Sequence, residues 1–151
     1  MKAADLFHIG IVAEDPGTTT ATLSAVLGYE WTAELGGPLQ VRLPSGETEL
    51  DLRCVYSTTT PRMEVVRAIP GTLWEPSPGA GVHHVGYWSD DVAADAAALE
   101  AEGYQIEASR DLPGGGLFFT FHRSPTGFRV ELVTRAAQQG MEAAFAAGAA
   151  E

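Results

Sequence analysis

Short stretches of alternating apolar and polar residues recur along the chain, and a period of two is typical of half-buried β-strands. Turn-forming residues separate these stretches, as at Pro44-Ser45-Gly46 and Gly114-Gly115-Gly116. The predicted strands span residues 7–12, 29–43 with a break at 36–38, 49–57, 62–68, 83–88, 104–109, 117–123 and 128–134.

Two stretches rich in Ala or Thr carry helix signals instead. Asp15 and Asp91 can each cap a helix N-terminus, and Pro16 fits the first turn of the helix that follows Asp15. The stretches end at Gly28 and Gly103, as expected of glycine C-caps. The pattern therefore predicts one helix between Asp15 and Gly28 and another between Asp91 and Gly103.

The first strand and helix recur in the second half of the chain. Phe7-His8-Ile9-Gly10-Ile11-Val12 matches His83-His84-Val85-Gly86-Tyr87-Trp88, and the same offset holds, to within one residue, up to the glycines that end the helices. We therefore predict an α+β fold and one domain, residues 1–151, made of two tandem βαβββ modules. Module one covers about residues 6–68, a linker 69–80, and module two about 81–134. The tail, 135–151, is predicted to be a short or frayed helix without chemistry.

The composition supports a globular domain and limits the classes of molecule that the protein could bind. Hydrophobic residues make up 45% of the 151 residues and charged residues 19%, which argues against disorder. A net charge of −11 makes nucleic acid and anionic membrane surfaces poor partners. Cys54 is the sole cysteine, so no internal disulfide can form, and we expect an inert packed thiol. Neither a signal peptide nor a membrane span is recognisable, so we expect a cytoplasmic protein.

Strand parity selects the histidines that face the concave side of the sheet. His8 shares a face with Gly10 and Val12, whereas Phe7, Ile9 and Ile11 share the other face and should pack under the helix. His84 occupies the matching position in the second copy, with Gly86 and Trp88 on its face. His83 is then predicted to point toward the helix side or an edge.

The strands that close the modules carry a second matched pair. Met63-Glu64-Val65-Val66 resembles Val130-Glu131-Leu132-Val133, with a single carboxylate in each apolar strand. A lone buried carboxylate is costly unless it is paired or bound to a metal. His8, His84, Glu64 and Glu131 are therefore candidate ligands of one divalent ion: Zn, Ni, Co, Mn or Fe(II). Asp51 on the neighbouring strand is an alternative to Glu64.

Three further residues are candidates for substrate binding. Trp88 shares the face of His84 and is the one aromatic residue that parity assigns to the cup, although Trp74, Tyr87, Phe119 and Phe121 could also line a pocket. Arg129 shares strand and face with Glu131 and could meet an anionic group. His122 could face either the cup or solvent.

The paired His-x-Gly strands, the glycine-ended helices and the closing Gly127-Phe-Arg-Val-Glu131-Leu resemble the vicinal oxygen chelate superfamily. Gly81-Val-His-His84-Val looks most like its methylmalonyl-CoA epimerase and glyoxalase I branch. The resemblance covers about residues 6–134 and implies a cup-shaped mixed sheet, the ligand set His8, Glu64, His84 and Glu131, and a homodimer.

The leading functional hypothesis is a metal-dependent isomerase, epimerase or lyase. Its small-molecule substrate would chelate the metal through vicinal oxygens, and Glu131 or Glu64 would move the proton alpha to a carbonyl; His122 is a weaker candidate for that base. An Fe(II) extradiol-type dioxygenase is one alternative, and it would need Glu64 not to be a ligand. A metal-free small-molecule-binding or antibiotic-resistance protein is the other.

Overall fold

The computed structural model describes residues 1–78 and 81–148. Residues 79–80 of the predicted linker and 149–151 of the predicted tail lie outside the described residues. The elements follow the order η1 (Ala3–Asp5), β1 (Leu6–Ala13), α1 (Pro16–Leu27), β2 (Leu35–Leu43), β3 (Gly46–Tyr56), β4 (Met63–Arg67), β5 (His84–Ser89), α2 (Val92–Ala101), β6 (Gln105–Asp111), β7 (Leu117–Arg123), β8 (Arg129–Thr134), η2 (Arg135–Ala137) and α3 (Gln138–Ala147).

The two modules join edge to edge into one curved, closed sheet. Its strand order is β1-β4-β3-β2-β6-β7-β8-β5. Within each module the first and last strands are parallel, β1 with β4 and β5 with β8, and the modules meet where β1 runs antiparallel to β5. The opposite seam is slight, because β2 and β6 share one paired position, Arg42 with Ser109. The α+β fold with a cup-shaped mixed sheet is thus confirmed.

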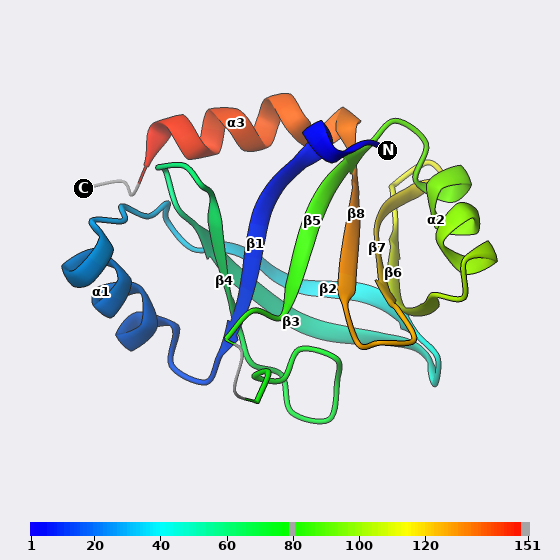
Figure 1. Cartoon of the computed structure of the whole chain (residues 1–151), viewed down its shortest axis with the longest axis horizontal. Helices are drawn as coiled ribbons and strands as arrows, with labels where there is room; N and C mark the ends of the chain where they lie inside the picture. Colours follow the sequence, from blue (N-terminus) through cyan, green and yellow to red (C-terminus); the bar gives the residue numbers. More distant parts are fainter. Residues whose placement is uncertain (79–80, 149–151) are drawn as a thin grey trace.

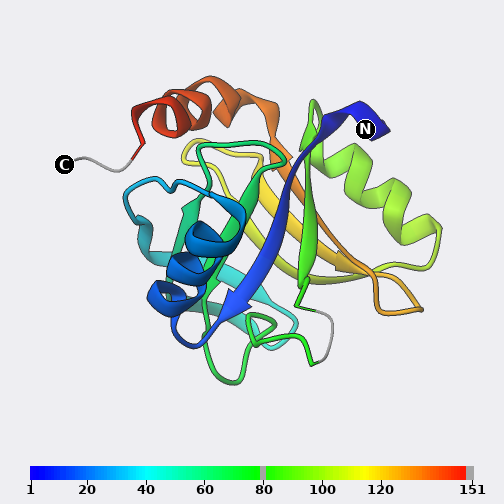
Figure 2. The ribbon, with the colours of Figure 1, turned by 60° about the vertical axis from the view of Figure 1, so that its left-hand side comes forward.

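The two predicted helices form as their caps indicate and lie on the outside of the barrel (Figure 2). The Asp15 carboxylate accepts a hydrogen bond from the Thr18 amide, and Gly28 ends α1 with a φ of 73°. The Asp91 carboxylate caps α2 through the Ala94 amide, and the C-cap of α2 is Glu102, one residue before the predicted Gly103. None of these described helices is long and apolar enough to cross a membrane.

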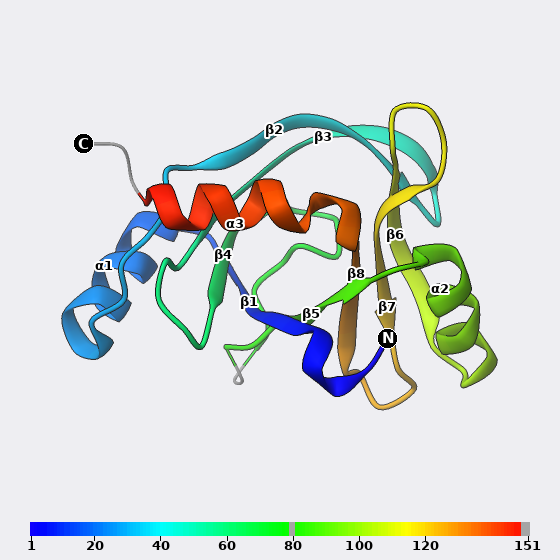
Figure 3. The same cartoon turned by 90° about the horizontal axis from the view of Figure 1, so that it is seen from above.

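Two apolar clusters hold the strands and helices together. The larger one fills the inside of the barrel and includes Val41, Val66, Trp74 and Phe121. The second lies between α2 and the outer face of β5, β7 and β8, where Leu99 packs with its neighbours. At one end of the barrel, α3 runs across the opening and covers it (Figures 1 and 3).

The structure corrects two predicted elements. Residues 36–38 do not break a strand but belong to β2, while 29–34 lie before it. Phe7 does not pack under α1; its ring stacks on Trp88 inside the barrel, with ring centroids 3.7 Å apart. The cause is an irregularity between Leu6 and His8 in the β1–β5 pairing, which shifts side-chain parity at that point.

Candidate metal centre

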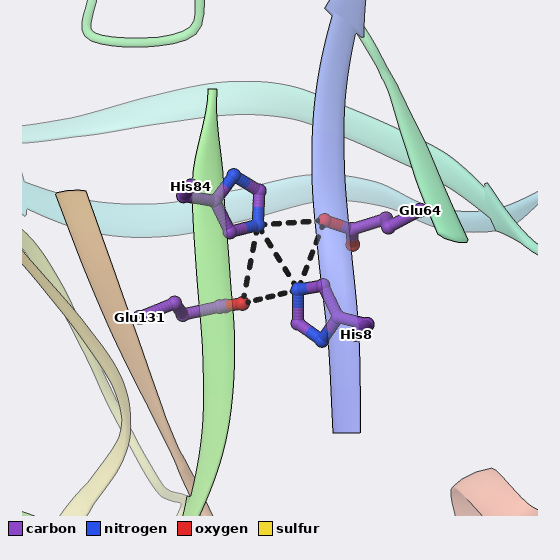
Figure 4. A group of neighbouring side chains, drawn as sticks. All are labelled: His8, Glu64, His84 and Glu131. Carbon is purple, nitrogen blue, oxygen red and sulfur yellow. Dashed lines mark hydrogen bonds and ion pairs between the residues drawn. The ribbon is translucent and has the colours of Figure 1, made fainter. Parts of the chain in front are cut away.

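Four buried side chains from four strands converge inside the barrel (Figure 4). His8 lies on β1, Glu64 on β4, His84 on β5 and Glu131 on β8, and one donor atom of each lies within 4.8 Å of all the others. The two Nε2 atoms are 3.0 Å apart. The Oε2 atom of Glu64 lies 3.0 Å from His84 Nε2, and that of Glu131 lies 3.1 Å from His8 Nε2.

Strand register explains why the four side chains meet. Across the β1–β5 seam His8 pairs with Gly86, and Gly10 pairs with His84. The same glycines pair outward with the carboxylate positions, Gly10 with Glu64 and Gly86 with Glu131. Each glycine therefore lies between the glutamate of its own module and the histidine of the other.

These two glycines are needed because the histidine rings occupy the space of a side chain. A Cβ built on Gly10 would overlap the His84 ring, and one built on Gly86 would overlap the His8 ring. The His-x-Gly motif thus acts across the repeat: the glycine of each copy makes room for the histidine of the other copy.

The buried charges of the centre determine its protonation. Burial alone lowers the pKa of His8, but the carboxylates of Glu64 and Glu131 outweigh it and raise that pKa to about 9. The pKa of His84 is raised for the same reasons. For Glu64, burial raises the pKa, yet the two imidazoles outweigh burial and hold it well below its ordinary value. Without another cation, the centre thus takes up protons to balance its carboxylates.

A hydrogen-bonded chain fixes the orientation of His84. His83 Nε2 lies 2.6 Å from the carbonyl oxygen of Leu73, which can only accept, so this nitrogen carries a proton. The pKa of His83 is lowered to about 4, by burial and by the neighbouring His84, so the ring is neutral and its Nδ1 is an acceptor. His84 Nδ1, 2.9 Å away, must then donate to it. When neutral, His84 therefore presents the lone pair of Nε2 to the centre of the cluster.

The four residues fit a divalent metal ion. Neighbouring ligands of one ion, each at ~2.0–2.2 Å, lie about 2.8–3.6 Å apart, depending on the angle between them. The separations of 3.0–3.5 Å between the imidazole nitrogens and the carboxylate oxygens agree with that range. In the described part of the chain, the buried Oε2 atom of Glu131 has no hydrogen-bond donor, although it is 3.1 Å from His8 Nε2. Two imidazoles and two carboxylates suit the borderline divalent metals.

The centre opens onto a cavity of about 200 Å³ through its carboxylates. Glu64 and Glu131 belong to the cavity wall, whereas the two histidines lie behind it. Most of the remaining wall is apolar, with aromatic rings from Trp74, Phe119 and Phe121. A ligand in the cavity would thus meet the two carboxylates before the two imidazoles.

The C-terminal helix, expected to carry no chemistry, contributes to this site. Met141 of α3 lines the cavity. Phe145 packs against Tyr56, with ring centroids 5.1 Å apart, and Tyr56 in turn packs edge-on against His8. The sequence does not reveal this contribution, because an Ala-rich tail carries no signal that shows where it docks.

The site and fold together agree with a match to a family model over residues 7–121, most of the chain. The model describes the glyoxalase/bleomycin resistance protein/dioxygenase superfamily. The chain belongs to this superfamily. This confirms the resemblance drawn from the His-x-Gly strands. No curated protein sequence matches the chain.

Solved structures of the superfamily have the same fold. A variant of the Streptomyces coelicolor methylmalonyl-CoA epimerase in complex with 2-nitronate-propionyl-CoA is 23% identical, with a TM-score of 0.55 over 88% of this chain and 98% of that one. The Mycobacterium tuberculosis methylmalonyl-CoA epimerase is 15% identical, with a TM-score of 0.58 over 93% and 97%. A hypothetical protein from Bacillus halodurans is 18% identical, with a TM-score of 0.54 over 86% and 93%. At these identities the likeness establishes the fold of the superfamily.

Other predicted site residues lie outside the cavity. Asp51, the alternative fourth ligand, is exposed and pairs with Arg53 at 2.8 Å, so the cluster contains Glu64 instead. Trp88 lies on the inner face, as parity predicted, but its ring stacks on Phe7 and is not part of the cavity wall. Arg129 pairs with Glu107 at 2.5 Å and lines a separate surface depression, away from the metal centre.

His122 differs most from its predicted position. It pairs with Val130, a residue of the cluster beneath α2, whereas the adjacent Phe121 pairs with Glu131 and faces the cup. His122 is therefore buried on the opposite side of the sheet, and it does not reach the cavity. Neither ring nitrogen has a hydrogen-bond partner in the described part of the chain, and burial lowers its pKa. The prediction that it lines the cup, as a substrate contact or as the base, is wrong.

Proposed function

We propose that the chain is a divalent-metal-dependent isomerase, epimerase or lyase of the glyoxalase and methylmalonyl-CoA epimerase type. One observation carries the proposal: Glu64 and Glu131 belong to the two-His, two-Glu cluster and also form the base of an apolar cavity. A substrate in the cavity then has both carboxylates beside its reacting atoms.

Each carboxylate has a defined task in this proposal. A bound divalent ion would supply Lewis-acid stabilisation of the enolate oxygen of a substrate chelated through two neighbouring oxygens. One glutamate takes the proton alpha to the carbonyl, and the electron pair of that C–H bond moves into the enolate. The same or the opposite glutamate then returns a proton to carbon. Because Glu64 and Glu131 come from matching strands of the two modules, they suit proton removal at one face and return at the other.

The surrounding residues would exclude water from the site and hold the metal-binding side chains in position. Trp74, Phe119 and Phe121 line the cavity, and the barrel is covered at one end by α3. Excluding water strengthens every electrostatic interaction at the base of the cup. The His83–His84 hydrogen bond fixes the ring orientation that metal binding needs.

The dioxygenase alternative fits the cluster less well. It would need two histidines and one carboxylate as ligands, with open positions at Fe(II). Here Glu64 Oε2 lies 3.0 Å from His84 Nε2, so this carboxylate belongs to the cluster as fully as Glu131 does.

The first test is metal content, measured by elemental mass spectrometry. We expect about one divalent ion per chain in the wild type and its loss in His84→Ala, because removing one of four ligands opens the site. Gln40→Ala, on the exposed face of β2, is the matched control and should retain the ion. A wild type that takes up no ion even after reloading would refute metal-dependent catalysis.

The second test is proton exchange at carbon. The metal-loaded protein is incubated in D₂O with acyl-CoA thioesters that carry an alpha-carboxylate, and with 2-oxoaldehyde adducts, and deuterium uptake is followed by NMR. We expect uptake at the carbon alpha to the carbonyl, its loss on metal removal, and a fall of at least about 100-fold in Glu131→Gln. Full exchange activity in metal-free protein would contradict the proposal.

A further inference from the structure

Arg110 is the cationic side chain in the wall of the cavity. It lies on β6, where it pairs with Phe119, while Ala108, two residues earlier, pairs with Phe121. Both phenylalanines line the cavity, so Arg110 shares the inner face of the barrel with them. In the barrel, β6 lies opposite β1, the strand of His8, and two strands from β8, the strand of Glu131.

The charge of Arg110 is not neutralised within the described part of the chain. No carboxylate there comes within 4.0 Å of its guanidinium, which lies over the Phe118 ring at 4.9 Å from the centroid. Most other arginines are in ion pairs, such as Arg42 with Asp111 at 2.9 Å and Arg53 with Asp51 at 2.8 Å. Arg110 is half-buried, because it also borders a surface depression, and its guanidinium has no ion-pair partner in the described residues of a protein whose net charge is −11.

The charge balance of the loaded cup indicates what Arg110 would bind. A divalent ion and the carboxylates of Glu64 and Glu131 sum to zero, and both ligand histidines are neutral when they bind metal. Arg110 then leaves one positive charge in the cavity. An apolar wall increases the attraction between that charge and an anionic group of a ligand.

The size and lining of the cavity limit the rest of the ligand. Its volume of about 200 Å³ is below the ~300–1,000 Å³ typical of pockets for drug-sized ligands. Trp74 and Phe119 both stand edge-on to Phe121, at 5.4 and 5.5 Å between centroids, and they form a wall suited to a ring or a branched alkyl group.

We infer that the part of the substrate that enters the cavity is compact, apolar and singly anionic, with vicinal oxygens at one end for the metal and a carboxylate at the other end for Arg110. The inference rests on the proposed function, since it requires a chelating substrate. It adds a second binding point, which nothing in the ligand cluster implies, and makes Arg110 the residue that selects for an anion.

Two probes that differ only in charge test the inference on zinc-loaded protein. Both carry a catechol as the chelating group: 3-(3,4-dihydroxyphenyl)propanoate and its neutral primary amide. By calorimetry we expect the acid to bind wild type about 10-fold more tightly than the amide, as one charge-assisted hydrogen bond would give. Arg110→Gln and Arg110→Met should lose this preference and keep the amide affinity, which shows that the site is still folded.

The matched control is Arg67→Gln, an exposed arginine on β4 paired with Glu34, which should keep the preference. Equal binding of acid and amide to wild type, or a preference that survives Arg110→Gln, would overturn the role of Arg110 and leave chelation intact. Binding of neither probe would instead overturn the chelating site, and the inference with it.

Discussion

The two histidines of the candidate metal centre differ in the hydrogen bond made by their second ring nitrogen. His84 Nδ1 donates to His83, which is anchored to the Leu73 carbonyl, whereas the buried Nδ1 of His8 has no hydrogen-bond partner in the described residues. Hydrogen bonds of this kind fix the tautomer and the orientation of a ligand histidine. We therefore expect His83→Ala to weaken metal binding by about 10- to 100-fold, measured by competition with a chelating dye.

A second buried histidine provides the control for this prediction. His122 lies beneath α2 and has no contact with the centre, so His122→Gln should leave the metal affinity unchanged within about 2-fold, since distant sites act independently. Equal losses in both variants would mean that burial of a histidine, rather than the His83–His84 hydrogen bond, supports the site.

At the scale of the strands, the β1–β5 seam brings the modules together and builds the centre at the same time. Its two glycines make room for the opposite histidine rings. We expect Gly10→Ala to displace His84 and Gly86→Ala to displace His8. Each variant should bind metal at least about 10-fold more weakly, because a ligand displaced by ~1 Å no longer has the geometry that the metal requires. Isothermal titration with Zn²⁺ or Mn²⁺ measures the effect.

The same substitution at another glycine separates crowding from a general effect of alanine. Gly140 lies in α3, and nothing stands within 4 Å of a Cβ built on it. Gly140→Ala should bind metal as the wild type does and be slightly more stable, because glycine costs about 1 kcal/mol inside a helix. If Gly10→Ala bound metal as tightly as the wild type, the His84 ring could move aside without any loss of metal affinity, and the prediction would be wrong.

For the whole molecule, the charges of the centre link stability to pH. The pKa of His8 is raised from 6.5 to about 9, and that of His84 is also raised, so the folded metal-free protein binds these protons more tightly than the unfolded chain. Their contribution to stability is complete below pH 6.5 and is lost as the pH rises through about 9. In the folded protein His83 is neutral and Glu64 is ionised throughout this window, so the protons that the folded centre loses come from His8 and His84.

We therefore expect the melting temperature in EDTA to fall by at least about 5 °C between pH 6.5 and 9. With saturating metal the fall should largely disappear, because a bound ion keeps both histidines unprotonated at every pH in the window. Thermal unfolding followed by circular dichroism tests this, and His8→Gln/His84→Gln in EDTA is the control that should lose the dependence. The same fall with and without metal would place its origin outside the centre.

Local signals in the sequence were sufficient to predict the main elements and the four residues of the candidate metal centre. The caps at Asp15 and Asp91 and the glycine at Gly28 act through neighbouring backbone, so sequence alone located both helices. The internal repeat made His84 the equivalent of His8 and Glu131 the equivalent of Glu64. Because strand parity within one element needs no tertiary information, it directed these side chains to the inside of the sheet, and they form one cluster there.

Only the tertiary structure decided what surrounds that cluster. The shift at Leu6–His8 turned Phe7 inward, the pairing of β7 with β8 put His122 beneath α2, and the docking of α3 brought Met141 to the cavity. Arg110 reaches the same wall because β6 pairs with β7, which in turn pairs with β8, the strand of Glu131. Each of these side-chain positions depends on strand register or helix docking between segments far apart in the chain. Short-range sequence patterns carry no information about register or docking.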